Sequence, residues 1–243
     1  TNNAYWAPVS RFRRADGTPA VYPHSVTDRG KPGFIAVDRR GQRFTNEAVS
    51  YHEFVQAMFR AHAIPAFLIC DRAGMWKYGL GAVKPFTVSL GAHTASGYLA
   101  RGSSVRALAE ALGIDPAALE ATVRRYNEDA RTGVDQAFRK GSDAYGKYLG
   151  DADHLPNPCM APLERAPFYA VAMYPGDLGT AAGLRTNVHA QVLDAAGAPI
   201  AGLYACGNDM NTIMNGGYPG PGITLGPALT FGYIAGRHLA RAE

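Results

Sequence analysis

The chain has 243 residues, of which 47% are hydrophobic and 18% are charged. This composition supplies enough apolar side chains for one large core or two smaller ones, and it is unlike that of a disordered chain. The formal net charge is +4. The basic residues are scattered and no nucleic-acid-binding motif accompanies them, so we expect no nucleic-acid partner.

Cysteine and histidine usage argues against a disulfide scaffold and against a metal site. Cys70, Cys159 and Cys206 form neither a C-x-x-C pair nor a zinc-ligand spacing. The seven histidines show no H-x-x-x-H pairing, and we predict no metal. No run approaches the ~18 apolar residues of a membrane-spanning helix. We therefore expect a cytoplasmic protein with no integral membrane segment, and peripheral association with a membrane stays open.

The first half of the chain predicts strands and helices in mixed order. Apolar runs bounded by turn residues predict strands, and apolar residues at helical spacing predict helices. The predicted elements are two strands around a turn within 33–47, a helix at 50–60, a short buried strand at 66–70 and two helices within 103–131. Ser50 with Glu53 forms a capping box, and Asp115 with Pro116 begins the last of these helices after a stop at Gly113.

The second half is predicted to begin with an irregular stretch. Residues 132–167 are polar, aromatic and rich in proline, and we expect little regular structure there. Strands are predicted at 168–171, at 190–194 and, as a short buried strand, at 203–206. A final helix is predicted at 227–241, and its apolar beginning indicates burial. Helices mixed with mainly antiparallel strands predict an α+β fold.

The densest glycine cluster lies directly before the final helix, in the string GGYPGPGITLG at residues 216–226. A glycine-rich loop at a helix N-terminus offers unpaired backbone N–H groups and the positive end of the helix dipole, which favour an electron-rich ligand. The alternative is an ordinary surface turn, since proline and glycine also mark turns. Neither this loop nor the Gly79-x-Gly81 segment completes a dinucleotide-binding fingerprint, so we expect no diphosphate site in this sequence.

Two strings of residues carry a resemblance to a known family. The first is PGFIAVD at 32–38 with GQRFTNE at 41–47, leading to Tyr51. The second is LYACGN at 203–208 with YPGPGITLGPA at 218–228 and FGYIA at 231–235. Together they resemble the flavoprotein family that unites succinate dehydrogenase and fumarate reductase flavoprotein subunits with 3-ketosteroid dehydrogenases. YPGPG, together with PGDLG at 175–179, resembles the 3-ketosteroid Δ1-dehydrogenase branch in particular.

This resemblance implies a fold, a domain organisation and a cofactor. It implies a catalytic domain of the fumarate reductase flavoprotein type at residues 12–181. Residues 182–243 would then be the C-terminal strand-and-helix segment of a discontinuous FAD-binding domain, whose N-terminal portion would precede Thr1. The implied cofactor is FAD, held by the intact protein and weakly or not at all by this chain alone. The implied partners are that N-terminal FAD-binding portion and a small hydrophobic carbonyl substrate.

The resemblance also implies roles for individual residues. Tyr51 resembles the tyrosine that removes a proton from the carbon next to the ketone. Tyr218 and the backbone N–H of Gly222 resemble the pair that polarises the carbonyl. The positions that resemble flavin contacts are Gly207, Asn208, Gly222, Ile223, Thr224 and Leu225. From the residues alone, Tyr51 could equally be a core tyrosine at the start of a helix.

The chemistry agrees with these roles. Removing hydrogens from C1 and C2 of a 3-ketone needs a proton acceptor at C2, donors at the ketone oxygen and, at C1, a hydride acceptor that no side chain can supply. A tyrosine base has the difficulty that its ordinary pKa is about 10. The stretch 176–183 has no cation of the kind that dicarboxylate-handling relatives use, which favours a neutral carbonyl substrate. A fumarate reductase-like oxidoreductase and a binding fragment without bound FAD are the alternatives.

Overall fold

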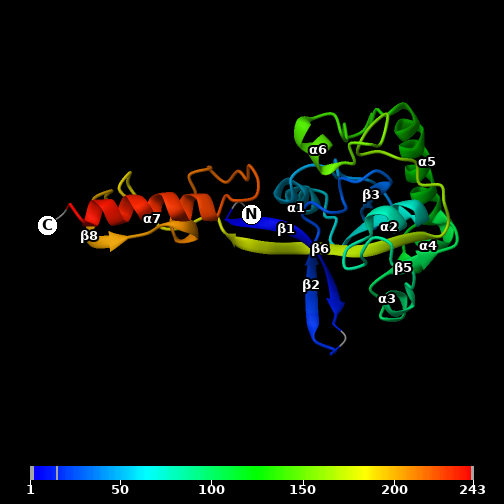
Figure 1. The fold of residues 1–243 in the computed structure, drawn as a ribbon, viewed down its shortest axis with the longest axis horizontal. Coiled ribbons are helices and arrows are strands. Elements are labelled where there is room, and N and C mark those ends of the chain that lie inside the picture. The colour runs from blue at the N-terminus through cyan, green and yellow to red at the C-terminus, as the bar shows by residue number, and fades with distance from the viewer. Residues whose placement is uncertain (1–2, 15, 242–243) are drawn as a thin grey trace. The chain divides into compact units, whose positions relative to one another are not determined.

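The structure is a computed structural model that describes residues 3–14 and 16–241 (Figure 1). The chain forms two compact units. Residues Ala7–Gly176 make the larger unit, and Thr1–Trp6 with Asp177–Glu243 make the smaller one. The assignment of residues 12–181 to a catalytic domain and of 182–243 to an FAD-binding segment stays a prediction.

The main sheet is six-stranded and mostly antiparallel, with the strand order β2-β1-β6-β4-β3 and with β5 also paired to β6. Its strands are β1 (Ala4–Arg13), β2 (Pro19–Pro23), β3 (Phe34–Val37), β4 (Ala66–Asp71), β5 (Ala100–Gly102) and β6 (Phe168–Thr180). The helices of the larger unit are α1 (Tyr51–Arg60), α2 (Arg72–Tyr78), α3 (Gly91–Ala95), α4 (Val105–Leu112), α5 (Pro116–Thr132) and α6 (Ala144–Leu149). Helix α4 packs against α5 and against β5 (Figure 1).

Capping residues set the helix boundaries where the sequence predicts them. The Ser50 side chain accepts a hydrogen bond from the Glu53 N–H at 3.2 Å, so α1 begins at Tyr51. Gly113 ends α4 in the left-handed conformation. Asp115 caps α5, and a proline occupies the first turn of that helix. These helices and the buried strand β4 are therefore confirmed.

The core of the larger unit lies between the sheet and α4–α5. Strand β3 contributes Ile35 and Val37, and the helices contribute Leu108, Leu119 and Tyr126. All five side chains are buried, and full burial of such a side chain contributes about 1.5–3 kcal/mol. The faces of β3, α4 and α5 therefore form a large part of this core, to which β4 and β6 add Phe67, Ile69 and Phe168.

A buried ion cluster stands beside this core and explains part of the string GQRFTNE. Arg43 donates from Nε and Nη2 to the Glu47 carboxylate, at 2.8 Å in both cases, and forms two further bonds with Asp135 at 3.0 and 2.9 Å. The Lys140 Nζ lies 3.4 Å from Glu47 Oε2. Glu47 also accepts the Ala36 N–H at 3.0 Å, which ties the cluster to β3. Because these groups are almost completely buried, each charge depends on its partners.

The smaller unit is built around a two-stranded ribbon and one long helix. The ribbon consists of β7 (Gln191–Leu193) and β8 (Pro199–Tyr204), which pair antiparallel. A 3₁₀ turn, η1 (Gly207–Asp209), packs against α7 (Leu225–Leu239). The Tyr204 hydroxyl and the His238 ring nitrogen Nδ1 are 2.8 Å apart, which joins β8 to α7. Figure 1 shows α7 running alongside the ribbon.

Two burial predictions for the smaller unit were wrong. Strand β8 is exposed along most of its length and ends at Tyr204, whereas a buried strand was predicted at 203–206. Helix α7 has no fully buried residue among those described. The reason is that a two-stranded ribbon can cover only one side of a helix. The side chains of Leu225, Leu229 and Tyr233, spaced four residues apart, are consequently exposed.

The larger unit also departs from the prediction in places. The stretch 132–167 contains α6, which Asp143 caps by accepting the Gly146 N–H at 2.7 Å. The second strand expected within 33–47 is reduced to one bridge between Val37 and Arg43, because Arg43 turns toward the ion cluster. Among helices that the described residues form, none combines the length and apolar character required to cross a membrane.

Candidate functional site

The glycine-rich loop at 216–226 exposes its backbone. Gly220 and Gly222 have φ angles of +153° and +99°, which side chains other than glycine rarely adopt. A Cβ atom placed on Gly220, Gly222 or Gly226 would meet no heavy atom within 4 Å. The three glycines are therefore not explained by close packing within the unit. They leave an open strip of backbone that a flat ligand could approach.

The same strip carries unused hydrogen-bond donors. Within residues 3–14 and 16–241, the backbone N–H groups of 222–225 make no hydrogen bond of standard distance and angle, although residues 221–224 form a turn. The first bond of the α7 ladder runs from the Gly226 N–H to the Gly222 carbonyl at 2.7 Å. Thr224 provides no side-chain cap. Such free N–H groups, together with the positive end of the helix dipole, favour an electron-rich or anionic group.

The second predicted flavin-contacting segment lies directly against the start of α7. Gly207 has a φ of +63°, and a Cβ atom on it would lie 3.1 Å from the Ala228 Cβ, so a side chain there would press on the helix. The Asn208 carbonyl accepts a hydrogen bond from Thr180 Oγ1 at 2.8 Å. Gly207, Asn208 and Ile223 line one small cavity. The structure thus brings the two predicted cofactor-binding segments together.

A wider hollow of about 450 Å³ adjoins the loop. Its lining is mainly apolar and includes Met214, Pro221, Ile223 and Phe231. A shape of this kind suits a flat hydrophobic ring system better than a small polar ligand.

Tyr218 is half-buried and packed against an aromatic residue from the beginning of the chain. The rings of Tyr5 and Tyr218 meet edge to face, with their centroids 5.1 Å apart and an interplanar angle of 69°. The Tyr5 hydroxyl is in turn hydrogen-bonded to Thr212 Oγ1. Sequence reasoning missed Tyr5 and Thr212, because no local pattern links residues that are 207 positions apart.

Tyr51 belongs to the larger unit, whereas Tyr218 and Gly222 belong to the smaller one. It is the first residue of α1, directly after the Ser50 cap, and its side chain is only 5% exposed. A helix-terminal position with a capped start holds the backbone of Tyr51 in one place. The shared role of these three residues in one reaction is part of the proposal below.

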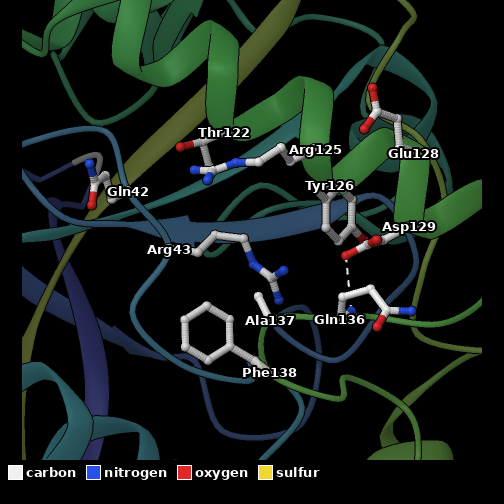
Figure 2. A pocket seen from close by; sticks show the side chains of 10 residues that line it. All are labelled: Gln42, Arg43, Thr122, Arg125, Tyr126, Glu128, Asp129, Gln136, Ala137 and Phe138. Carbon is white, nitrogen blue, oxygen red and sulfur yellow. Dashed lines mark hydrogen bonds between the residues drawn. The ribbon is translucent and has the colours of Figure 1, made fainter.

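A separate pocket of about 520 Å³ lies beside the buried ion cluster (Figure 2). The Arg43 guanidinium lies over the Tyr126 ring at 5.0 Å and the Phe138 ring at 5.1 Å. Figure 2 also shows the Gln136 N–H donating to Asp129, at 3.0 Å. Burial raises the pKa of Tyr126, so its hydroxyl stays protonated. This pocket contains none of the predicted site residues.

Another cluster has the residue types of a hydrolase triad. His24 lies 2.6 Å from Asp28 Oδ2 through Nδ1 and 2.8 Å from Ser10 Oγ through Nε2. The Ser10 hydroxyl is also 2.7 Å from the Tyr98 hydroxyl, and both Ser10 and His24 are buried. No carbonyl substrate can reach a serine enclosed in this way. The cluster is therefore structural, and its carboxylate also holds the Gly81 N–H at 3.0 Å.

Comparison with known proteins identifies the family of this chain. The FAD binding domain family matches residues 1–225, and the chain belongs to it. The chain is 44% identical over 240 residues to 4-oxocyclohex-2-ene-1-carboxylate 5-dehydrogenase of Sinomonas cyclohexanicum, a match that covers 97% of this chain and 40% of that protein. It is 37% identical over 248 residues to 3-oxosteroid 1-dehydrogenase of Mycobacterium tuberculosis, covering 98% of this chain and 43% of that protein.

A solved structure gives the same result for the fold. The crystal structure of 3-ketosteroid Δ1-dehydrogenase from Sterolibacterium denitrificans, in complex with 1,4-androstadiene-3,17-dione, matches with a TM-score of 0.92 and 38% identity. The match covers 99% of this chain and 43% of that one. The resemblance and the α+β fold of the fumarate reductase flavoprotein type are thereby confirmed, and FAD is the cofactor of the family. The chain spans about two-fifths of the length of the relatives that it matches.

Proposed function

We propose that this chain supplies the carbonyl-binding and flavin-contacting residues of an FAD-dependent dehydrogenase that acts on a 3-ketosteroid-like cyclic ketone. In this proposal Tyr51 removes a proton from the carbon next to the ketone. Tyr218 and the Gly222 N–H hold the ketone oxygen. Gly207, Asn208, Ile223, Thr224 and Leu225 contact the cofactor.

One observation carries the proposal: the open backbone strip ahead of α7. Its glycines leave free space where side chains would otherwise stand, and the N–H groups of 222–225 make no hydrogen bond of standard geometry among the described residues. Gly207 and Asn208 lie against the same helix start. A flavin ring is flat and gains negative charge at one edge when reduced, so both features suit it.

Each residue of the proposed site has one chemical task. Bound FAD would supply the hydride acceptor that the protein lacks. The Tyr218 hydroxyl and the Gly222 N–H would donate to the ketone oxygen, where negative charge develops as the proton leaves. Loss of one donor of this kind costs about 2.7–4 kcal/mol of transition-state stabilisation. The apolar hollow beside the loop would hold the hydrocarbon part of the substrate.

The test uses the natural polypeptide that contains this sequence, loaded with FAD. Reduction of an artificial electron acceptor is followed with a 3-ketosteroid as substrate. We expect Tyr218→Phe to lower kcat by about 10²–10³-fold, the cost of one lost donor. Tyr148→Phe is the matched control, because Tyr148 is exposed and lies in the larger unit. An unchanged kcat for Tyr218→Phe would remove this residue from the mechanism.

The 44% identity over 240 residues to an oxocyclohexenecarboxylate dehydrogenase favours a second candidate substrate, because the steroid dehydrogenases that match over nearly the whole chain do so at 37–38%. In that case the substrate is a single six-membered cyclic ketone that carries a carboxylate. The same assay compares kcat/KM for a 3-ketosteroid and for 4-oxocyclohex-2-ene-1-carboxylate. A ratio above about 100 in either direction, equivalent to about 2.7 kcal/mol, assigns the substrate class.

The same experiments test two alternative functions. Fumarate reduction with ketones inert would select a fumarate reductase-like enzyme. The stretch 176–183 argues against this, because it contains no cation to bind a dicarboxylate. A binding fragment without redox activity would be selected if the FAD-loaded polypeptide oxidised none of these substrates.

A further inference from the structure

Arg29 is a buried cation in the larger unit, on the segment between β2 and β3. Its side chain is 1% exposed. The guanidinium donates from Nε to the His24 carbonyl at 2.6 Å and from Nη2 to the Ser25 carbonyl at 2.9 Å. From Nη1 it donates to the carbonyls of Glu47 at 2.8 Å and Val49 at 3.3 Å. Four backbone carbonyls therefore hold the guanidinium in one position.

Within the part of the chain that the structure describes, Arg29 forms no salt bridge, although two carboxylates are near. Asp28 is bonded to His24 at 2.6 Å, and Glu47 is bonded to Arg43 at 2.8 Å. Burying a charge without a direct counterion is costly, and neutral donors could hold carbonyl groups at lower cost. The positive charge therefore calls for a role beyond holding the loop together.

The position of Arg29 relative to α1 indicates that role. The Val49 carbonyl that Arg29 holds lies two residues before Tyr51. The guanidinium also stands 4.7 Å from the ring centre of Phe54, which lies three residues after Tyr51 on the same side of α1. Arg29 thus contacts the chain on both sides of Tyr51.

The electrostatics agree with this geometry. Burial lowers the pKa of Arg29 to about 10, while Asp28, Tyr145, Glu47 and Tyr51 act in the opposite direction. The guanidinium is therefore still charged at neutral pH. Tyr51 is therefore one of the groups whose charge would interact favourably with the guanidinium, and such an interaction is reciprocal. The groups whose charges act on the Arg29 guanidinium are Asp28, Tyr145, Glu47 and Tyr51, and the backbone carbonyl of His24 accepts from its Nε.

We propose that Arg29 is a positioning residue for Tyr51, which holds the segment leading into α1 through the Val49 carbonyl, packs on Phe54 and places a positive charge at the start of this helix. This inference rests on the proposed role of Tyr51 as the proton acceptor. It answers the difficulty that a tyrosine is ordinarily protonated at neutral pH. Arg29 acts through Tyr51 and need not touch the substrate.

The experiment measures kcat/KM against pH for the FAD-loaded polypeptide and three variants. Arg29→Gln removes the charge, Arg29→Lys keeps it, and Arg40→Gln is the control, because Arg40 is exposed in its ion pair with Asp38. We expect Arg29→Gln to lower kcat/KM at neutral pH about tenfold and to move the rise in activity about one pH unit upward, since one unit is a tenfold change in phenolate. Arg29→Lys should keep the rise at its original pH even where kcat falls. Arg40→Gln should change neither.

The outcomes separate this inference from the proposed function. If Tyr51→Phe is inactive while folded Arg29→Gln keeps the original pH profile, the charge role of Arg29 is wrong and Tyr51 stays in the mechanism. A fully active Tyr51→Phe removes both. If Arg29→Gln does not fold, replacement of Tyr51 by the more acidic 3-fluorotyrosine decides. The rise in kcat/KM should then move to lower pH, and Arg29→Lys should leave it in place. A rise that stays in place with 3-fluorotyrosine removes Tyr51 as the base and with it both proposals, whereas a rise that moves in Arg29→Lys overturns the charge role of Arg29 alone.

Discussion

The buried ion cluster allows the sharpest stability prediction, for the substitution Glu47→Gln. The Glu47 carboxylate takes part in two bonds from Arg43 at 2.8 Å, one from the Ala36 N–H at 3.0 Å and a contact with Lys140 at 3.4 Å. The glutamine is nearly the same size, so it leaves no cavity. It removes the negative charge and turns one acceptor into a donor that faces two cations.

The size of the stability loss depends on which cations lose their counterion. Arg43 keeps its two bonds to Asp135, whereas Lys140 keeps only the Phe34 carbonyl, at 2.5 Å, as a direct acceptor among the described residues. Breaking a buried pair by removing one partner typically costs 3–5 kcal/mol. For a unit of this size, each kcal/mol corresponds to about 2–4 °C in Tm. We therefore expect Glu47→Gln to lower Tm by roughly 6–20 °C.

Thermal and urea unfolding of the FAD-loaded polypeptide measure this loss. Glu110→Gln is the control, since Glu110 is exposed on α4, and it should change stability by less than about 0.5 kcal/mol. A loss below about 1 kcal/mol for Glu47→Gln would refute the reasoning. It would mean that the buried charges rearrange or admit water once the carboxylate is gone.

Two further predictions concern pH and the glycine-rich loop. Burial acts to raise the pKa of Glu47, but the charges of Arg43 and Lys140 lower it overall. The ionised Glu47 side chain therefore stabilises the fold fully above its unfolded pKa of about 4.3, and this stabilisation is lost as pH falls through the lower folded pKa. Urea unfolding at a series of pH values should therefore show acid destabilisation that is smaller in Glu47→Gln; an identical acid loss in both would contradict it. Gly222→Ala should weaken FAD binding at least about tenfold, measured by flavin fluorescence, because it places a methyl group on the open strip at a φ of +99°. Gly197→Ala in the β7–β8 turn is the matched control, because Gly197 has a φ of +89° and equally open space but no proposed contact with the cofactor. Equal flavin affinity in the two variants would remove the strip from the cofactor site.

Sequence reasoning predicted best those features that depend on neighbouring residues. The starts of α1 and α5 follow from Ser50 and Asp115, and the end of α4 follows from Gly113. Caps act within one turn of helix, so the signal is complete in four or five residues. The two segments expected to contact the flavin are also brought together, although they are separated along the chain.

Features that depend on distant contacts were missed. The apolar start of the helix predicted at 227–241 indicated burial, yet Leu229 is exposed and Ala228 and Phe231 are only half-buried. An apolar sequence shows that a surface favours being covered, but it does not show which element covers it. The packing of Tyr5 on Tyr218 joins opposite ends of the chain. Arg29 gave no signal either, since its four acceptors are backbone carbonyls that any residue provides.

The two strings that carry the family resemblance meet different physical requirements. In the first, Arg43 and Glu47 are enclosed and form a closed network with β3, so changes there should act on folding. In the second, Gly220 and Gly222 face open space and make no demand on internal packing, so changes there should act on the ligand. Changes at Tyr51 could act on folding or on the reaction. Tyr51 follows the first string, is nearly enclosed, and is flanked by the contacts of Arg29. A tyrosine needed only for packing would lose little on conversion to phenylalanine, so the activity of Tyr51→Phe at unchanged Tm distinguishes a base from a core residue.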